Sequence, residues 1–233
     1  MGSIANWLAA ARTGLRGRCV LCLAPGAAPG LCAACSDDLP AIDTARCPVC
    51  ALPTPGAAVC GACGLHPPGF DRTVAAHAYA FPVDRLVQGL KYGGRLAVAP
   101  ALGHRLGIAA RLDQVPDVVV AMPLSAARLR ERGFNQALEI ARLLPPHLAR
   151  RIRIDLLTRP RDTRPQAELP VDQRARNVRN AFACDQRLDG AHVAVVDDVM
   201  TTGATLDAAA AALKSAGAVA VSGWVVARTL RHD

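Results

Sequence analysis

The sequence predicts an α/β protein in which a parallel β-sheet, covered by helices on both faces, follows a small cysteine-rich module. Two observations carry this prediction. Eight of the nine cysteines have occurred by Cys63, and beyond them short apolar runs alternate with segments of helical periodicity. Apolar runs separated by helices are typical of parallel sheets buried on both faces. With 233 residues, the chain is long enough for one such domain and a small module.

The first 18 residues predict a short N-terminal helix. Their apolar patch has neither a leading basic segment nor a clean cleavage site, so we expect no signal peptide and a cytoplasmic protein. Apolar runs elsewhere are interrupted well before the ~18 residues that a membrane span needs, so no membrane insertion is expected.

The formal net charge is +8 and is carried almost entirely by arginine. Such a balance fits a nucleic acid, a phosphorylated ligand, or a G+C-rich genome that encodes Arg in place of Lys. Two Zn²⁺ ions bound by eight thiolates would lower the charge to about +4. The net charge therefore does not distinguish between these three explanations.

The cysteines form the pattern C-x2-C-x9-C-x2-C twice. The ligand positions are Cys19, Cys22, Cys32, Cys35, Cys47, Cys50, Cys60 and Cys63. Each C-x2-C turn offers two sulfurs from a tight loop, and two turns complete a tetrahedral zinc site. We therefore predict a double zinc ribbon over residues 19–65 with two Zn²⁺ ions, which are structural because four sulfurs leave no open position.

The spacing of nine residues favours local pairing, in which each C-x2-C-x9-C-x2-C repeat holds its own ion. A cross-braced arrangement is the alternative. Iron in the same four-sulfur geometry, disulfides and redox dithiols are the other chemistries that these cysteines could serve.

The Pro/Gly-rich joint Gly64–Gly69 marks the domain boundary, and residues 70–233 form the predicted α/β domain. Its first elements are a strand at Val74–Ala80 and helices at Val83–Leu90 and Pro100–Leu112. The run Asp117–Met122 is wholly apolar after its first residue and ends at a proline, which is typical of a buried strand.

The alternation continues in the second half of the domain. Asn135–Leu144 has apolar residues at helical spacing, and Ile152–Leu157 predicts a short strand. The polar, Arg-rich segment Thr158–Asn180 has no periodicity and predicts a long loop, which in a compact domain is usually functional or disordered. The last three elements are a buried strand, a helix closed by Gly217 and a final strand, at His192–Val196, Thr205–Ala216 and Ala218–Val226.

The stretch VAVVDDVMTTGAT, residues 193–205, combines a buried strand with two carboxylates and a turn rich in hydroxyls. Ligands of open parallel sheets bind beyond the carboxyl ends of the strands, where Asp197 and Asp198 are predicted to lie. Adjacent carboxylates there suit vicinal ribose hydroxyls or a magnesium-bound sugar. The free amides of the turn that leads into the next helix suit a phosphate, and Gly203 allows its close approach. Together they predict a ribose 5-phosphate site, and the alternative is an Asp turn with a Thr N-cap.

These residues resemble the phosphoribosyltransferase signature, in which an apolar strand, two acidic residues and two variable positions precede Thr-Thr-Gly-x-Thr. The resemblance extends further, to the ComF family. The stretches that carry it are LKYGGR (90–95), MPLSAARLRERGFNQALEIAR (122–142) and TRPRDTRPQAELPVDQRARNVRNAF (158–182), preceded by the doubled cysteine pattern.

The resemblance implies a type I phosphoribosyltransferase fold that binds phosphoribosyl pyrophosphate (PRPP) with Mg²⁺. It implies that Asp197 and Asp198 bind the ribose hydroxyls and that the signature loop binds the 5-phosphate. This loop comprises Val199, Met200, Thr201, Thr202, Gly203, Ala204 and Thr205. The pyrophosphate loop would be Pro123, Leu124 and Ser125, and the candidates that neutralise pyrophosphate are Arg128, Arg130 and Arg132, because Arg binds its oxygens in bidentate fashion.

The loop Thr158–Asn180 resembles the flexible lid that closes over the ligand in this fold. Its arginines, which include Arg159, are alternatively contacts for nucleic acid.

Three functions follow from these patterns. The first is a phosphoribosyltransferase, or an enzyme-like PRPP binder, whose acceptor no residue specifies. The second is a binding module, because family members are linked to natural transformation and to single-stranded DNA and DNA-uptake proteins in the cytoplasm. Aromatic residues make up only 3% of the chain, so DNA contacts would be mainly to phosphates. The third is a PRPP-sensing regulator. Fold is therefore better determined than function.

Overall fold

The computed structural model describes residues 17–25, 29–42, 45–160 and 181–230. The predicted N-terminal helix lies almost entirely outside these ranges. So does most of the predicted loop Thr158–Asn180, of which only the first three residues are described.

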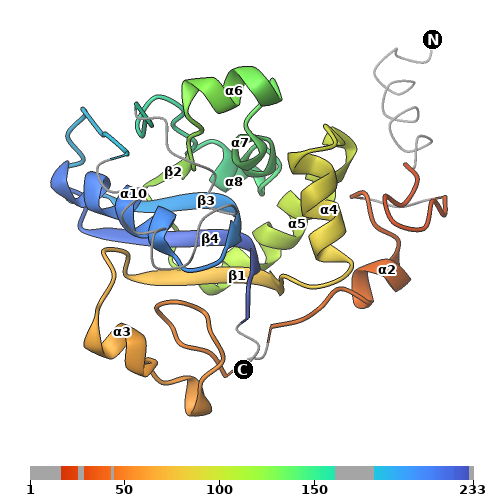
Figure 1. Cartoon of the computed structure of the whole chain (residues 1–233), viewed down its shortest axis with the longest axis horizontal. Helices are drawn as coiled ribbons and strands as arrows, with labels where there is room; N and C mark the ends of the chain where they lie inside the picture. The colour runs from red at the N-terminus through yellow and green to blue at the C-terminus, as the bar shows by residue number, and fades with distance from the viewer. Residues whose placement is uncertain (1–16, 26–28, 43–44, 161–180, 231–233) are drawn as a thin grey trace, which may run out of the picture.

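A parallel sheet of four strands forms the centre of the described residues, in the order β1-β4-β3-β2 (Figure 1). The strands are β1 (Arg72–Ala78), β2 (Val118–Ala121), β3 (His192–Met200) and β4 (Ala220–Arg228). Every neighbouring pair is parallel. The two inner strands are almost wholly buried, as expected for apolar strands with both faces covered.

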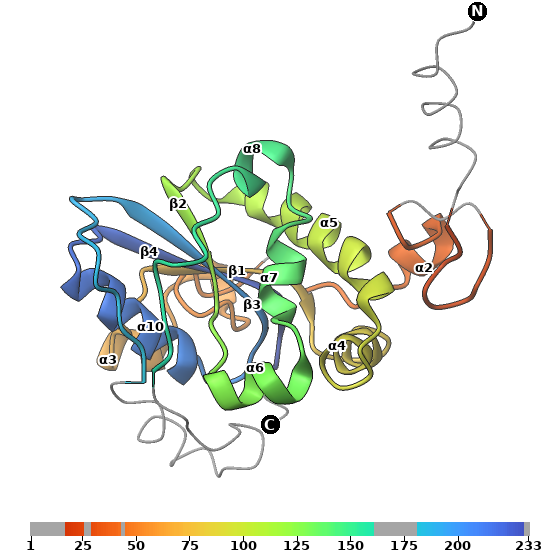
Figure 2. The ribbon, with the colours of Figure 1, turned by 90° about the horizontal axis from the view of Figure 1, so that it is seen from above.

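Helices cover both faces of the sheet, as predicted (Figure 2). On one face lie α4 (Val83–Lys91), α5 (Ala99–Ala109) and α7 (Gln136–Ala141), and on the other lies α10 (Ala204–Ser215). The shorter helices are α2 (Ala33–Asp37), α3 (Gly61–Leu65), α6 (Ala126–Arg132), α8 (Pro146–Ala149) and the 3-10 turns Pro55–Ala57, Leu96–Val98 and Ala110–Leu112. None of the helices in the described residues has the length and apolar character that a membrane span requires.

Helix α4 illustrates how the sequence pattern becomes packing. Val83, Leu86, Val87 and Leu90 follow the i, i+3, i+4, i+7 spacing and are the buried residues of the helix. They place the apolar stripe against the sheet. The last residue of the helix, Lys91, is therefore carried to the edge of the core, beyond the carboxyl end of β1.

The predicted strand at Ile152–Leu157 is wrong. Only one residue of it bridges the sheet, where Ile152 lies beside Val119 on the outer edge of β2. The backbone N–H of Arg153 donates to Val119 O at 2.9 Å, and after it the chain bends while Leu156 and Leu157 turn into the core. No backbone hydrogen bond joins residues 154–157 to β2 in the described part of the chain, so the strand does not continue past Arg153.

The strand predicted at His192–Val196 is longer than expected, because β4 continues to pair with β3 as far as Met200 opposite Arg228. The neighbour on the other side, β2, ends at Ala121 opposite Val196. Asp197 and Asp198 are therefore inside β3, on the part that extends past β2. The open edge next to them is the space in which a ligand can lie.

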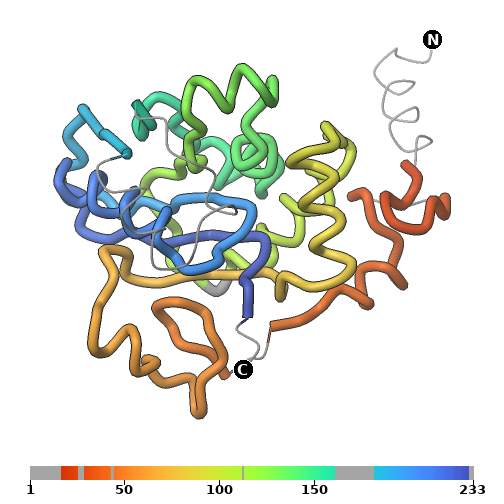
Figure 3. The backbone as a smooth tube through the Cα atoms, viewed as in Figure 1, coloured from red at the N-terminus to blue at the C-terminus, as the bar shows by residue number. Residues whose placement is uncertain are grey.

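The cysteine repeats pack on the α/β domain, and they do so at two separate places (Figures 1 and 3). The first repeat, with α2, lies beside α5, where Arg105 Nη1 donates to Ser36 Oγ at 3.2 Å. The second repeat, with α3, lies under β1, where Thr73 N donates to Pro48 O at 3.2 Å. Cys47 and Cys50 belong to the core shared with α10 and β3.

Candidate functional site

The eight cysteines form two four-sulfur clusters, each from one repeat. The four sulfurs of each cluster lie within 4.8 Å of one another. The first cluster comprises Cys19, Cys22, Cys32 and Cys35, and the second comprises Cys47, Cys50, Cys60 and Cys63. Each cluster is formed by the four cysteines of a single repeat, as the spacing favoured, and the cross-braced alternative is excluded.

The clusters have the dimensions of a zinc–thiolate centre. Zn–S bonds of about 2.3 Å in a tetrahedron place the sulfurs roughly 3.8 Å apart. The Sγ atoms of Cys22 and Cys32, and those of Cys50 and Cys60, are 3.6 Å apart. Backbone amides also favour the thiolate form, since Cys60 N donates to Cys47 Sγ at 3.3 Å. Burial opposes the charge on Cys47, but the N–H groups of Cys60 and Cys50 outweigh it and lower the pKa of Cys47 to about 7.

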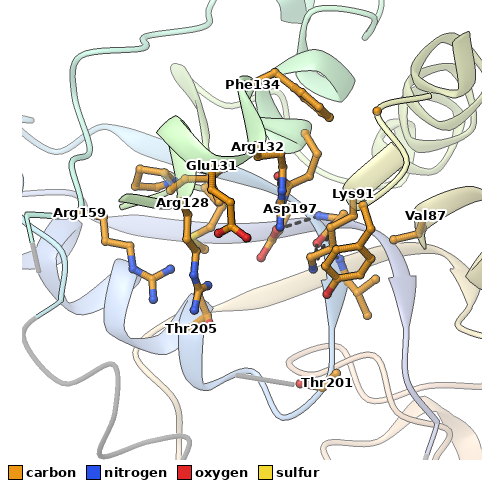
Figure 4. Close-up of a pocket in the computed structure, with 18 of the residues that line it drawn as sticks. Val87, Lys91, Arg128, Glu131, Arg132, Phe134, Arg159, Asp197, Thr201 and Thr205 are labelled. Carbon is orange, nitrogen blue, oxygen red and sulfur yellow. Dashed lines mark hydrogen bonds and ion pairs between the residues drawn. The ribbon is translucent and has the colours of Figure 1, made fainter. Parts of the chain in front are cut away.

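A cavity of about 700 Å³ opens at the carboxyl ends of the strands (Figure 4). Nine of the residues singled out from the sequence line it: Pro123, Leu124, Arg128, Arg132, Asp197, Asp198, Val199, Thr201 and Thr205. Side chains far apart in the chain therefore meet at one place. Lys91 lies beside Asp197 in the cavity, with Arg128 and Arg159 on the opposite side (Figure 4).

Six of the residues singled out from the sequence do not line this cavity: Ser125, Arg130, Met200, Thr202, Gly203 and Ala204. Ser125 is buried and caps α6, where its hydroxyl accepts from Arg128 N at 3.5 Å. Arg130 lies on the exposed side of the same helix. Alternate positions on a helix face different ways, so Arg128 and Arg132, one turn apart, share the face that Arg130 does not.

The two aspartates occupy different surroundings because successive strand residues face opposite sides of the sheet. Asp198 is buried on the α4 side, and its Oδ2 is 3.2 Å from Lys91 Nζ. Asp197 is partly exposed, and its Oδ1 accepts from Asp198 N at 2.8 Å. This bond replaces the sheet partner that β3 lacks beyond the end of β2.

Asp197 and Lys91 influence each other's ionisation. Burial, with the neighbouring Asp198 carboxylate, raises the pKa of Asp197 to about 8, although Lys91 opposes the change. Burial also disfavours the charge on Lys91, but Asp198 and Asp197 outweigh it and raise the pKa of Lys91. Near neutral pH the cavity therefore holds a cationic lysine and a carboxyl group poised to lose its proton.

The turn after β3 is shaped by Gly203, which has a φ of +87° and is buried. A Cβ there would lie 2.8 Å from Met200 Cε, the end of a flexible side chain, and 3.4 Å from Phe70 Cζ, so it is the backbone angle that favours glycine. Thr202 Oγ1 accepts from Ala204 N at 3.4 Å, next to the first turn of α10. Thr201 and Thr205 face the cavity on either side of this bend.

The RGFNQ stretch holds the opposite wall in place. Gly133, with a φ of +79°, ends α6, and Asn135 begins α7 by accepting from Ala137 N at 2.9 Å. Asn135 Nδ2 also donates to Met122 O at 3.0 Å, which ties the helix to the end of β2. Arg132 Nη1 donates to Gln136 Oε1, so the guanidinium is oriented by the next helix.

Several cavity residues had no ligand role in the sequence interpretation. They are Tyr79, Val87, Lys91, Tyr92, Gly94, Met122, Glu131, Phe134 and Gln136. Lys91 is the most telling, because it is one of only two lysines in a chain that otherwise uses arginine. Arg159 was expected in a lid or at nucleic acid, yet it is 7% exposed in the cavity wall with its guanidinium 5.2 Å from the Phe182 ring centre.

Comparison with known proteins places these features in a family. The model of the double zinc ribbon domain matches residues 15–64. The DNA utilization protein YhgH of Escherichia coli K12 is 37% identical over 170 residues, which cover 70% of this chain and 75% of that protein. Competence protein F of Haemophilus influenzae is 29% identical over 174 residues, covering 69% and 74%.

Among solved structures, the purine phosphoribosyltransferase of Pyrococcus horikoshii is similar with a TM-score of 0.32 and 19% identity, covering 67% of this chain and 87% of that one. The extent of identity to YhgH, together with the two four-cysteine clusters ahead of the parallel sheet, shows that the chain belongs to the ComF family and carries its double zinc ribbon.

Proposed function

We propose that the cavity binds PRPP, or a related ribose 5-phosphate ligand, together with Mg²⁺. One observation carries the proposal: the carboxylates of β3, the hydroxyls of the turn after it and the arginines of α6 all open onto a single cavity. A ribose 5-phosphate group with a second phosphate group needs these three kinds of contact.

Each group has a role in this proposal. The turn from Thr201 to Thr205 binds the 5-phosphate through its hydroxyls and the amides at the start of α10. Asp197 and Asp198 accept hydrogen bonds from the ribose hydroxyls, and their oxygens are also the ligand type that Mg²⁺ prefers. When bound, Mg²⁺ would neutralise part of the phosphate charge.

The arginines on the far wall suit the pyrophosphate end of the ligand. Arg128 and Arg132 lie one helical turn apart, and Arg132 is half-buried against the Tyr92 ring at 5.7 Å. Planar guanidinium groups bind two phosphate oxygens at once, which fixes the orientation of the ligand as well as its charge.

The relatives suggest where the protein acts. Those named for DNA utilization and competence support a role in DNA uptake, and we place this chain in the handling of incoming single-stranded DNA in the cytoplasm. Thiolate-bound zinc fits that reducing compartment. The DNA would be bound through its phosphates, without sequence preference.

Calorimetry with Mg²⁺ and PRPP tests the ligand, with ribose 5-phosphate and pyrophosphate as separate competitors. Both competitors should displace PRPP, because each carries part of what the cavity contacts. Release of pyrophosphate in the presence of an acceptor would identify an enzyme, whereas tight binding without release would identify a PRPP sensor. Absence of PRPP binding at millimolar concentration would refute the proposal.

DNA binding is tested separately. The affinity for single-stranded DNA should fall with salt, and replacing Arg174 and Arg176 with Gln should flatten the slope against log salt by about 1 to 2. These two residues lie outside the described part of the chain. An unchanged slope would remove them from the DNA site.

A further inference from the structure

Arg228 joins the second cysteine cluster to the turn that faces the cavity. It is the last residue of β4, and only 3% of it is exposed. Its Nε donates to the backbone carbonyl of Cys50 at 2.8 Å. Its Nη1 donates to Met200 O at 3.0 Å and to Thr201 O. One guanidinium therefore contacts a metal-ligand residue on one side and the start of the signature turn on the other.

These contacts contribute to how the turn presents its amides, together with Thr229 N, which also donates to Met200 O at 3.0 Å. A trans peptide is planar, with its C=O and N–H pointing in opposite directions. The carbonyls of Met200 and Thr201 point at Arg228, so the N–H groups of Thr201 and Thr202 point away from it. Those amides belong to the turn that binds the phosphate in the proposed function. Their direction is thus set from beneath by a residue that touches no ligand.

The Cys50 carbonyl is in turn connected to the metal cluster through the turn between Cys47 and Cys50. Cys50 occupies the knuckle turn in which Ala51 N donates to Cys47 O at 2.9 Å, and Ala51 has a φ of +59°. This turn keeps its shape when four sulfurs are held around one ion. Without that restraint, the strained residue next to Cys50 is free to relax, and the Cys50 carbonyl moves with it.

Buried charge makes the connection strong. An arginine guanidinium stays charged and needs acceptors for its donors wherever it is buried. Loss of the Cys50 carbonyl would leave Nε to find another acceptor and would draw the guanidinium away from Met200 and Thr201. The first cluster is linked to the domain differently: Arg95 Nη2 donates to Val20 O at 3.1 Å and Arg105 Nη1 donates to Ser36 Oγ at 3.2 Å, and neither bond involves the turn after β3.

We propose that Arg228 is a positioning residue that couples the second zinc centre to the signature turn, so that metal in this centre, and not in the first, sets the ligand affinity of the cavity. The affinity part rests on the proposed function. The coupling itself does not, because it predicts order in the turn whether or not a ligand binds.

Hydrogen exchange of residues 200–203 and calorimetry with ribose 5-phosphate test the proposal in four full-length variants. Cys60→Ser opens the second cluster and Arg228→Lys keeps the charge but removes the planar fork. Cys22→Ser and Arg105→Lys are the matched changes at the first cluster. Cys60→Ser and Arg228→Lys should speed hydrogen exchange in the turn and lower the affinity for ribose 5-phosphate about tenfold. Cys22→Ser and Arg105→Lys should change neither the exchange nor the affinity.

The double variant Arg228→Lys with Cys60→Ser should bind ribose 5-phosphate with the same affinity as either single variant, because the two changes interrupt the same connection. Zinc analysis should show both ions retained in Arg228→Lys, which separates the coupling from loss of metal and decides the question if Cys60→Ser unfolds. Unchanged exchange in Arg228→Lys, or equal effects of Cys22→Ser and Cys60→Ser, would overturn the inference. If wild type binds no ribose 5-phosphate, the proposed function fails, and the exchange result alone decides the coupling.

Discussion

Asp197→Asn should make the protein more stable while weakening its ligand binding. The change removes a carboxyl group whose pKa is raised from 3.8 to about 8 by burial and by Asp198. An asparagine has the same shape, and its side-chain carbonyl can still accept from Asp198 N, as Asp197 Oδ1 does at 2.8 Å. The substitution therefore removes the unfavourable ionisation and keeps the local hydrogen bond.

The size of the effect follows from proton linkage. Between pH 4 and 8 the folded chain keeps a proton on Asp197 that the unfolded chain has lost, so the stability of the wild type falls as the pH rises through this window. The full difference at pH 7 corresponds to about 4 kcal/mol, and solvent access to the partly exposed carboxyl reduces the expected gain to about 1–3 kcal/mol. For a chain of this size that is a rise in Tm of about 3–10 °C.

Thermal unfolding of both proteins from pH 4 to 9 measures this directly. The Tm of the variant should match that of the wild type near pH 4, exceed it increasingly up to about pH 8, and then keep a constant advantage. In the same buffers, wild-type affinity for Mg²⁺ and PRPP should rise up to about pH 8, since the ligand needs the ionised carboxylate. In the variant, affinity should be about tenfold lower at pH 8 and should lack the part of this rise that Asp197 causes, so that only the titration of the ligand's phosphates remains. A variant that is less stable than the wild type at pH 7 would refute the reasoning.

Three further results are expected. Asp198→Asn should lower the Tm, in contrast to Asp197→Asn, because it removes the carboxylate that lies 3.2 Å from Lys91 Nζ. Equal Tm values of wild type and Asp198→Asn in calorimetry would count against this ion pair. Arg132→Gln should weaken competition by pyrophosphate about tenfold while Arg130→Gln, on the exposed side of α6, leaves it unchanged, and equal losses would place both arginines in the site. Elemental analysis of protein purified without chelator should find two zinc ions per chain, and one or none would contradict the two four-sulfur clusters.

Local patterns in the sequence were sufficient for most of the fold. The stripe of α4, the apolar runs of β3 and β4 and the doubled cysteine spacing depend on residues close together in the chain, and their period states which face is buried. The wrong prediction of a strand at Ile152–Leu157 also came from a local pattern. A short apolar run does not state whether its hydrogen bonds go to a strand or only to one residue at a sheet edge.

The candidate site was predictable where its chemistry is written in consecutive residues. Asp197, Asp198 and the turn to Thr205 form one stretch, and glycine at 203 indicates a close approach of the backbone. Arg128, Arg130 and Arg132 looked equivalent in the sequence. Only the orientation of α6, set by the caps at Ser125 and Gly133, separates the two that face the cavity from the one that faces solvent.

What the sequence by itself determined is therefore the kind of chemistry present: eight cysteines in two repeats, a pair of carboxylates at the end of a buried strand, and a turn of hydroxyls and amides. The tertiary structure decided which of these groups meet. Lys91 reaches Asp198 across 107 residues of chain, and Arg228 connects Cys50 with Met200. Such contacts depend on how helices and strands pack, and no local pattern encodes them because the partners share neither a turn nor a period.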